Sequence, residues 1–249
     1  MSATKLRVSC SGGIRRIVFA TENGINTLSF ANMMALNLEL HAAAEDHDTR
    51  VVLLYGEGRL FSAGLHLADM LKVVSSTGYD GGPLESLVTT LARFEKPIVA
   101  AVHGTAIGGG ATILLHCDLV VAAQSTTFQF PFVPLGVVPE FASAYLLRRC
   151  AGRLLANELV LLADPFDAET ALRAGIVNKV VSDQDVLSEA SRWAGKLASL
   201  PLEAVRASKI LLKSDVEAVI ATACAETHYL KAGFASAVFS KAAERFVKE

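Results

Sequence analysis

Residues 98–110 of this 249-residue chain read IVAAVHGTAIGGG and carry the clearest indication of its fold. The five apolar residues 98–102 predict a buried strand, because they show no alternation with polar residues. The glycine triplet 108–110 follows, and a helix is expected over residues 111–117. A buried strand, a glycine-rich turn and a helix in succession are typical of the α/β class.

A similar succession precedes it. The apolar run 51–55 predicts another buried strand, and residues 61–67 (FSAGLHL) lead into a helix beginning near Leu65. Residues 75–82 (SSTGYDGG) predict a flexible loop and a candidate lid. The pattern further predicts strands at 16–20, 119–123, 127–130 and 176–181, and helices at 30–45 with Ser29 as its cap, at 84–93 and at 139–149.

The last quarter of the chain has a different character. The change in composition near residue 185 is the one domain boundary that the sequence offers. We therefore predict a core of repeated ββα units over residues 1–185 and a helical region over residues 186–249. Apolar residues recur there at helical spacing, over 186–199, 202–213 and 215–247 with a break at Gly233.

Charge and hydropathy limit the classes of function. Lysine and arginine total 23 against 25 aspartates and glutamates, a net charge of −2 that gives no reason to expect a nucleic acid partner. The chain is 52% hydrophobic and 19% charged. This apolar excess predicts either insertion into a membrane or apolar surface buried in an oligomer.

Membrane insertion is the weaker of these interpretations. Residues 97–139 contain a single charge, Asp118, but the glycine triplet, Pro131 and Pro134 interrupt both apolar spans. The ends of the chain show no secretion or lipidation signal, so a cytoplasmic protein without membrane contact is expected. The four cysteines are far apart, which predicts free buried thiols and no metal site.

Two strand–glycine–helix junctions remain as candidate sites, because familiar motifs are absent. Gly110 stands where a phosphate-binding loop needs lysine, and Leu60 replaces the first glycine of a nucleophile elbow around Ser62. At each junction glycine lets the backbone approach a ligand, and the first helical N–H groups lack partners. Two such groups can converge on one developing oxyanion, although ordinary tight turns explain the same residues.

At this point the sequence resembles a known family over nearly its whole length. Residues 61–65 (FSAGL), 96–104 (KPIVAAVHG), 117–122 (CDLVVA), 128–136 and 174–177 (AGIV) are similar, in this order, to the enoyl-CoA hydratase/isomerase (crotonase) family. The resemblance implies a ββα spiral core with a C-terminal α-helical trimerisation region. It also implies an acyl-coenzyme A thioester substrate, no separate cofactor, and a homotrimer or a dimer of trimers.

The resemblance also assigns site residues. It implies that the backbone N–H groups of Leu65 and Gly109 form the oxyanion hole. His66 and Lys241 are expected to contact coenzyme A, although a surface histidine and a solvated lysine are the simpler interpretations. The remaining substrate-binding positions are Ala63, Gly64, Leu67 and Gly108 beside the hole, and Thr112 and Phe132 farther along the chain.

The side chains must determine which reaction is catalysed, because proteins that share one fold catalyse different reactions. Hydratases of the family use two glutamates, which alignment places at Thr112 and Phe132, so both carboxylates are missing here. Phe132 instead is expected to line the acyl pocket. Glu140, in the segment LGVVPE (135–140), resembles the catalytic glutamate of Δ3,Δ2-enoyl-CoA isomerases. Such an isomerase needs one group that removes a proton from C2 and returns it at C4.

Two opposing influences act on Glu140. Its charge-poor surroundings predict a raised pKa, whereas Pro139 predicts the first turn of a helix, whose dipole would lower it. Stabilisation of that helix is the alternative role. Phe141 and Ala142 depart from the isomerase pattern, which more often has glycine and a small residue, so the pocket is narrower or Glu140 points elsewhere.

The sequence therefore favours an isomerase with Glu140 as its single acid and base. A hydratase or another crotonase reaction is the alternative, and a non-catalytic acyl-CoA-binding or scaffold protein is the alternative from another class. His103 is interpreted as a hydrogen-bonded core histidine, and Asp118 as a residue that ties down a turn.

Overall fold

Two β-sheets form the core of the computed structural model, which describes residues 5–21, 24–76, 79–213 and 215–248. The larger sheet has six strands in the order β1-β2-β3-β4-β6-β9. Strand β1 is antiparallel to β2, and the other neighbours are parallel. The six strands are β1 (Lys5–Ser11), β2 (Ile14–Ala20), β3 (Val51–Gly56), β4 (Ile98–Val102), β6 (Leu119–Ala123) and β9 (Lys179–Val181).

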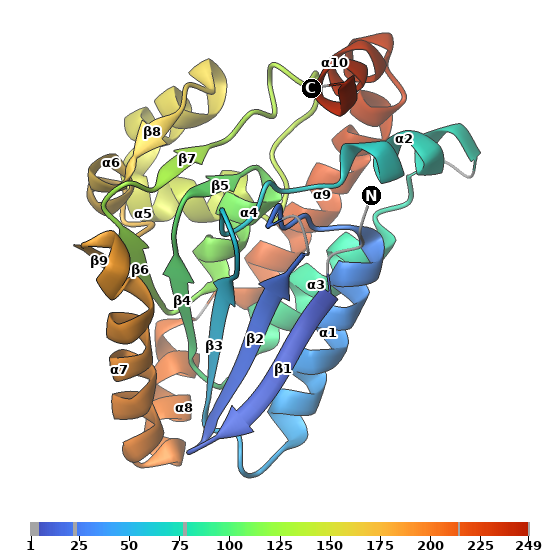
Figure 1. Cartoon of the computed structure of the whole chain (residues 1–249). Coiled ribbons are helices and arrows are strands. Elements are labelled where there is room, and N and C mark those ends of the chain that lie inside the picture. The colour runs from blue at the N-terminus through green and yellow to red at the C-terminus, as the bar shows by residue number, and fades with distance from the viewer. Residues whose placement is uncertain (1–4, 22–23, 77–78, 214, 249) are drawn as a thin grey trace.

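The smaller sheet lies where β3 and β4 end (Figure 1), in the order β5-β7-β8. Its strands are β5 (Thr105–Ile107), β7 (Thr127–Gln129) and β8 (Phe166–Asp167). Strand β5 occupies the glycine-rich stretch where only a turn is predicted. An isolated bridge joins Ser62 to Ala106 of β5. The chain after β3 therefore lies beside the chain after β4, which brings the two glycine junctions together.

Helices cover both faces of the large sheet (Figure 1). On one face α7 (Val186–Ser199) packs against β3, β4 and β6. On the other, α1 (Phe30–Glu45) packs against α3 (Gly82–Arg93), and α9 (Val216–Phe234) packs against α3. Neighbouring residues of β3 accordingly belong to different apolar clusters, Val51 with α7 and Val52 with the opposite face. Burial on both sides explains why these strands are apolar throughout.

Many predicted elements are confirmed. The strands at 98–102 and 119–123 and the helix at 30–45 have the predicted bounds, and the Ser29 hydroxyl accepts a hydrogen bond from the Asn32 amide as its cap. The C-terminal helices are also present. They and the other helices are α2 (Leu67–Ser76), α4 (Gly109–Thr112), α5 (Ser143–Asn157), α6 (Ala168–Arg173), α8 (Leu202–Leu212) and α10 (Ala237–Lys248).

Three local predictions are wrong. The helix expected at 139–149 begins at Ser143, because Phe141 and Ala142 adopt left-handed backbone angles. The helix expected at 111–117 is α4 followed by the 3-10 helix Ile113–His116. The strand expected at 176–181 is formed only from Lys179 onward. Part of the predicted loop at 75–82 lies outside the described residues.

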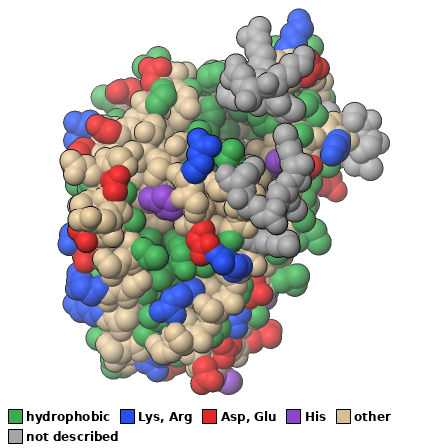
Figure 2. Space-filling view, in the orientation of Figure 1, with side chains coloured by type: hydrophobic (Ala, Val, Ile, Leu, Met, Phe, Trp, Pro, Cys, Tyr) green, Lys and Arg blue, Asp and Glu red, His purple; other side chains and the backbone are tan. Residues whose placement is uncertain are grey.

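Surface features of the described residues bear on the class of protein. Basic and acidic side chains are interspersed on the face shown in Figure 2. Among the described helices, none is long and apolar enough to cross a membrane.

The four cysteines are free, as predicted, but the expectation that they are buried is wrong, since Cys10, Cys150 and Cys224 are exposed. No group of three or more metal-ligating side chains occurs in the described ranges.

Candidate active site

The two glycine junctions meet at Gly64 and Gly109. Gly64 has a φ of +78°, and a Cβ atom there would lie 2.4 Å from the carbonyl oxygen of Ile107 and 3.2 Å from the amide nitrogen of Gly109. Only glycine fits both the backbone angle and the space. Hydrogen bonds from the Ser62 amide to Thr105 and from the Ile107 amide to Ser62 hold the two segments together.

Two backbone amides at this junction have no acceptor among the described residues. The Leu28 amide donates to Gly64 and the His66 amide donates to Leu28, so the pairing on that side does not involve the N–H of Leu65. Within the described part of the chain, the amides of Leu65 and Gly109 donate no hydrogen bond. Gly109 is the first residue of α4, where helical N–H groups lack partners. Two free donors on adjacent segments can bind one oxygen that gains negative charge.

The Glu140 carboxyl group lies against this junction. A Cβ atom on Gly109 would be 2.7 Å from Oε1 of Glu140, so the carboxyl contacts the backbone of Gly109. The Glu140 side chain is 1% exposed, and neither oxygen has a hydrogen-bond partner among the described residues. Burial, and secondarily Glu226, raise the pKa of Glu140 from 4.5 to about 8. A carboxyl group with this pKa can both accept and donate a proton near neutral pH.

The backbone after Glu140 is strained. Phe141 and Ala142 have φ values of 60° and 54°, which residues with a Cβ atom rarely adopt. Glu140 therefore precedes the helix, and the prediction that it lies in the first turn of that helix is wrong. Nε2–H of His116 donates to the Phe141 carbonyl at 2.8 Å, and the Glu226 carboxylate accepts from the Ala142 amide at 2.7 Å.

The other predicted substrate contacts lie around this centre. Gly108, with φ +51°, precedes α4 and has open space where a Cβ would stand. Thr112 is buried, and its hydroxyl donates to the Gly108 carbonyl at 3.2 Å, so it is occupied within the helix. Phe132 is buried and stacks on Phe130 at 6.5 Å between ring centroids. Ala63 and Leu67 are half-buried beside Gly64.

The polar residues that the sequence analysis singled out differ in their exposure and in their polar contacts. Nδ1 of His66 lies 3.0 Å from Oδ2 of Asp69, and Lys241 is exposed on α10. The interpretation of His103 as a core residue is wrong: its Nε2 lies 3.1 Å from the Gly58 carbonyl oxygen, but the side chain is only half-buried. Asp118 accepts a hydrogen bond from the Ile98 amide at 2.7 Å, which ties down the chain as expected.

Three residues near the site were missed by sequence reasoning. Tyr79 is buried, and its pKa is raised above its ordinary value by burial and by Glu140, with Thr227 acting in the opposite direction. His116 and Glu226 hold the backbone after Glu140. No local pattern signals these roles, because the contacts join residues far apart in the sequence, 84 positions in the case of Glu226 and Ala142.

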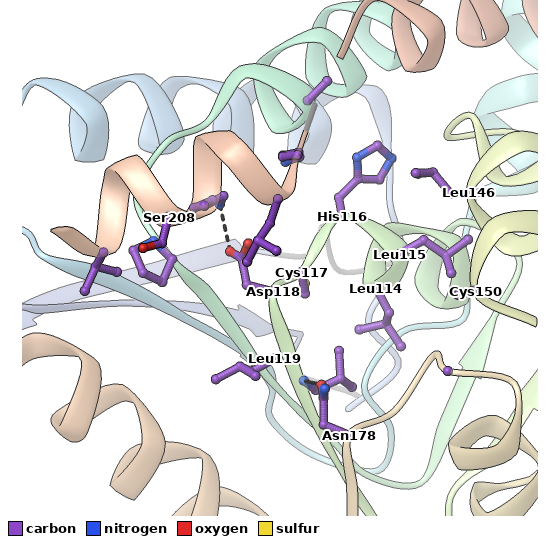
Figure 3. A pocket seen from close by; sticks show the side chains of 18 of the residues that line it. Leu114, Leu115, His116, Cys117, Asp118, Leu119, Leu146, Cys150, Asn178 and Ser208 are labelled. Atoms are coloured by element: carbon purple, nitrogen blue, oxygen red, sulfur yellow. Dashed lines mark hydrogen bonds and ion pairs between the residues drawn. The ribbon is translucent and has the colours of Figure 1, made fainter. Parts of the chain in front are cut away.

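A separate cavity of about 840 Å³ lies between the 3-10 helix Ile113–His116, α5 and α8 (Figure 3). Burial lowers the pKa of His116 to about 4 and raises that of Cys117 to about 12, so at neutral pH both are uncharged. Asp118 pairs with Lys209 at 2.7 Å. None of these groups is a free base or nucleophile, and Glu140 does not line the cavity. The candidate acid and base, Glu140, therefore lies outside this cavity, at the junction of Gly64 and Gly109.

Comparison with known proteins identifies similar chains. The model of the family described as enoyl-CoA hydratase/isomerase matches residues 9–249. The chain is 34% identical to the 2,3-dehydroadipyl-CoA hydratase of Escherichia coli K12, over 82% of this chain and 80% of that protein. It is 35% identical to the 1,2-epoxyphenylacetyl-CoA isomerase of the same organism, over 74% and 77%. The structure of OdaA from Pseudomonas aeruginosa superposes with a TM-score of 0.92 at 31% identity, over 98% of this chain and 99% of that one.

Proposed function

Because the chain belongs to the enoyl-CoA hydratase/isomerase family, we propose that it is an isomerase that moves the double bond of a 3-enoyl-CoA thioester to the 2 position. Glu140 is the single acid and base. The observation that carries the proposal is the position of its carboxyl group, buried, without a hydrogen-bond partner in the described chain, and in contact with Gly109.

The first step removes a proton from C2. The Glu140 carboxylate takes this proton, and the electrons of the C–H bond move toward the thioester carbonyl, whose oxygen becomes negatively charged. The N–H groups of Leu65 and Gly109 donate to that oxygen and stabilise the dienolate. Neither amide loses an existing hydrogen bond in this step, since neither donates one within the described chain.

The second step returns the same proton at C4. Glu140 is now a neutral acid. The oxygen electrons re-form the thioester carbonyl, the C1=C2 pair shifts to form the C2=C3 double bond, and the C3=C4 pair takes the proton at C4. Glu140 ends as a carboxylate, so no atom is gained or lost. A pKa of about 8 suits both directions of transfer, because the acid and the base are then similar in free energy near neutral pH.

Hydration is the second candidate, favoured by the name of the 2,3-dehydroadipyl-CoA hydratase relative. Addition of water needs one group to activate the oxygen and one to protonate carbon. Thr112 and Phe132 stand at the two positions of the hydratase glutamates and carry no carboxylate. The Thr112 hydroxyl is bonded to Gly108 and Phe132 is in an aromatic stack, so these contacts favour isomerisation.

The remaining contacts extend the proposal to the substrate. Ala63, Gly64, Leu67 and Gly108 surround the thioester, and Phe132 limits the acyl pocket. His66 and Lys241 lie outside the buried centre, where they reach the charged nucleotide part of coenzyme A.

A homotrimer, or a dimer of trimers, is also part of the proposal. Among the exposed large apolar side chains of the described residues, two groups support subunit packing, because water-exposed apolar surface is unfavourable. A mass measurement in solution tests this assignment, and a stable monomer would contradict it. The exposed side chains are Leu154, Leu161 and Leu162 on one side and Ile210, Leu211 and Leu212 on the other.

The test is a direct assay with a matched pair of variants. Purified protein mixed with a 3-enoyl-CoA should produce the conjugated 2-enoyl-CoA, followed by its ultraviolet absorbance. Glu140→Gln should lower the rate by roughly 10²–10⁴-fold while retaining calorimetric binding of a saturated acyl-CoA. Glu158→Gln, at an exposed glutamate, should leave the rate unchanged.

Two results would contradict the proposal. Rapid hydration of a 2-enoyl-CoA without isomerisation would assign the hydratase reaction. Binding of acyl-CoA with neither reaction would assign the non-catalytic alternative.

A further inference from the structure

We propose that Glu226, on helix α9, is a positioning residue for Glu140. Its carboxylate ties down the strained backbone that follows Glu140 and thereby holds the Glu140 carboxyl against Gly109. This inference rests on the proposed role of Glu140 as acid and base, and it assigns the C-terminal helical region a part in the catalytic centre in addition to subunit packing.

Within the described chain, the hydrogen bonds of the Glu226 side chain are with the start of α5. One carboxylate oxygen accepts a hydrogen bond from the Ala142 amide at 2.7 Å, and the other accepts from the Ala144 amide at 3.3 Å. The Glu226 side chain is 7% exposed, so these bonds are shielded from water. A buried carboxylate that accepts two backbone N–H groups fixes their positions more firmly than an exposed one.

Helix α5 lacks a cap of its own. Its N-cap residue is Ala142, which has no side chain that can accept a hydrogen bond from the first turn. Ala142 also has a left-handed φ of 54°, and Phe141 before it has a φ of 60°. Strained angles of this kind persist only where neighbouring groups hold them. Glu226 holds Ala142 from α9, and His116 holds the carbonyl of Phe141.

The same carboxylate acts on Glu140 through its charge. Burial raises the pKa of Glu226 to about 7, partly offset by the amides of Ala144 and Ala142, and its charge contributes to the raised pKa of Glu140. From the segment before α3, Tyr79 faces Glu140, and Asp80 and Glu85 act on Tyr79 in turn. Within the described chain no lysine or arginine shifts the pKa of either carboxyl. Two like charges therefore oppose each other without a compensating cation.

The two actions of Glu226 on Glu140, through the backbone and through charge, differ in their effect on pH dependence. Removal of the Glu226 charge lets Glu140 ionise at a lower pH, whereas loss of the bonds to the Ala142 and Ala144 amides lowers the fraction of correctly placed Glu140 carboxyl groups. The experiment therefore measures kcat/KM for the 3-enoyl-CoA against pH, together with the titration of the Glu140 carboxyl carbon by ¹³C NMR, in each variant.

Three variants separate the two contributions. Glu226→Gln removes the charge but keeps one acceptor oxygen, and it should lower kcat/KM on the order of 10-fold and move the Glu140 titration to lower pH. Glu226→Asp keeps the charge but shortens the reach. It should lower kcat/KM on the order of 10-fold with a titration closer to that of the unmodified protein. Glu217→Gln, on the same helix with an 82% exposed side chain, should change neither.

The outcomes decide between explanations. Unchanged kcat/KM in both Glu226 variants would overturn the inference, whereas a loss of rate in both variants without any shift of the Glu140 titration would support the hold on the backbone and exclude the effect of charge. If the unmodified protein shows no isomerisation but Glu226→Gln still shifts the Glu140 titration to lower pH, the proposed function fails and the action of the Glu226 charge on Glu140 stands. A circular dichroism spectrum of each variant confirms that it folds.

Discussion

Replacing Glu140, the proposed acid and base, should make the protein more stable while removing the proposed activity. Glu140→Gln removes an ionisable group that is 1% exposed and has no hydrogen-bond partner in the described chain. Glutamine has nearly the same size and shape, so the packing against Gly109 is kept. What changes is the free energy of placing a negative charge in this apolar site.

The magnitude follows from the pKa of Glu140, which is 4.5 as its ordinary value and about 8 in the folded protein. Because the folded state holds the proton more tightly than the unfolded state, stability present below pH 4.5 is lost as the pH rises toward 8. Each pH unit in this interval lowers the free energy of unfolding by about 1.4 kcal/mol. At pH 7 the loss amounts to roughly 3 kcal/mol, and the variant does not incur it.

Thermal unfolding at two pH values is the assay. For a chain of this length, roughly 3 kcal/mol corresponds to an increase in Tm of about 6–12 °C. Glu140→Gln should therefore have a higher Tm than the unmodified protein at pH 7, with a much smaller difference at pH 4.5. Glu158→Gln, which removes an exposed charge, should differ little at either pH.

One result would refute the reasoning. If Glu140→Gln gave the same change in Tm at both pH values, ionisation of Glu140 would cost nothing in the folded state. The carboxyl group would then have partners or water around it, and its proposed use as a proton shuttle with a raised pKa would lose its basis.

Three further predictions concern the same structure. Gly109→Ala would place a Cβ 2.7 Å from Oε1 of Glu140 and should lower kcat/KM on the order of 10²-fold. The control is Gly195→Ala on α7, where a Cβ would meet no atom within 4 Å. This control should raise the free energy of unfolding in urea by up to about 1 kcal/mol. The pH profile of kcat/KM should rise as Glu140 ionises and level off above its pKa of about 8, whereas a profile that falls over this range would exclude Glu140 as the initial base. Lys209→Met leaves Asp118 without its partner at 2.7 Å and should lower the free energy of unfolding by about 3 kcal/mol, measured in urea; an unchanged midpoint would show that the pair contributes nothing.

The elements predicted most accurately are those fixed by local chemistry. Buried strands at 98–102 and 119–123 are unbroken apolar runs, and Ser29 is a cap whose bond partner lies three residues away. The pair of glycine junctions was also visible in the sequence. Strand β5, only three residues long, was not, because its pairing depends on β7 and on Ser62 rather than on its own composition.

The setting of Glu140 could not be read from its neighbours. Pro139 predicts a helix start, and a helix would have placed Glu140 beside a positive dipole. Instead, Phe141 and Ala142 take left-handed angles that their side chains disfavour, and the bond from Ala142 to Glu226 spans 84 positions. Local propensity was outweighed by a tertiary contact, and this is the expected place for such a failure, since strained backbone concentrates at functional sites.

The apolar excess of the chain acquires a specific use at this site. In the described part of the chain, four charged side chains are buried. Lys96 bonds to backbone carbonyls, Lys209 pairs with Asp118, and Glu226 accepts hydrogen bonds from two amides, whereas Glu140 has no hydrogen-bond partner among the described residues. An unpartnered buried carboxyl is costly, and an unpartnered amide is too. Their occurrence together at Gly109 is therefore best explained by a substrate that completes both, with its acidic carbon presented to Glu140 and its oxygen held by the Leu65 and Gly109 amides.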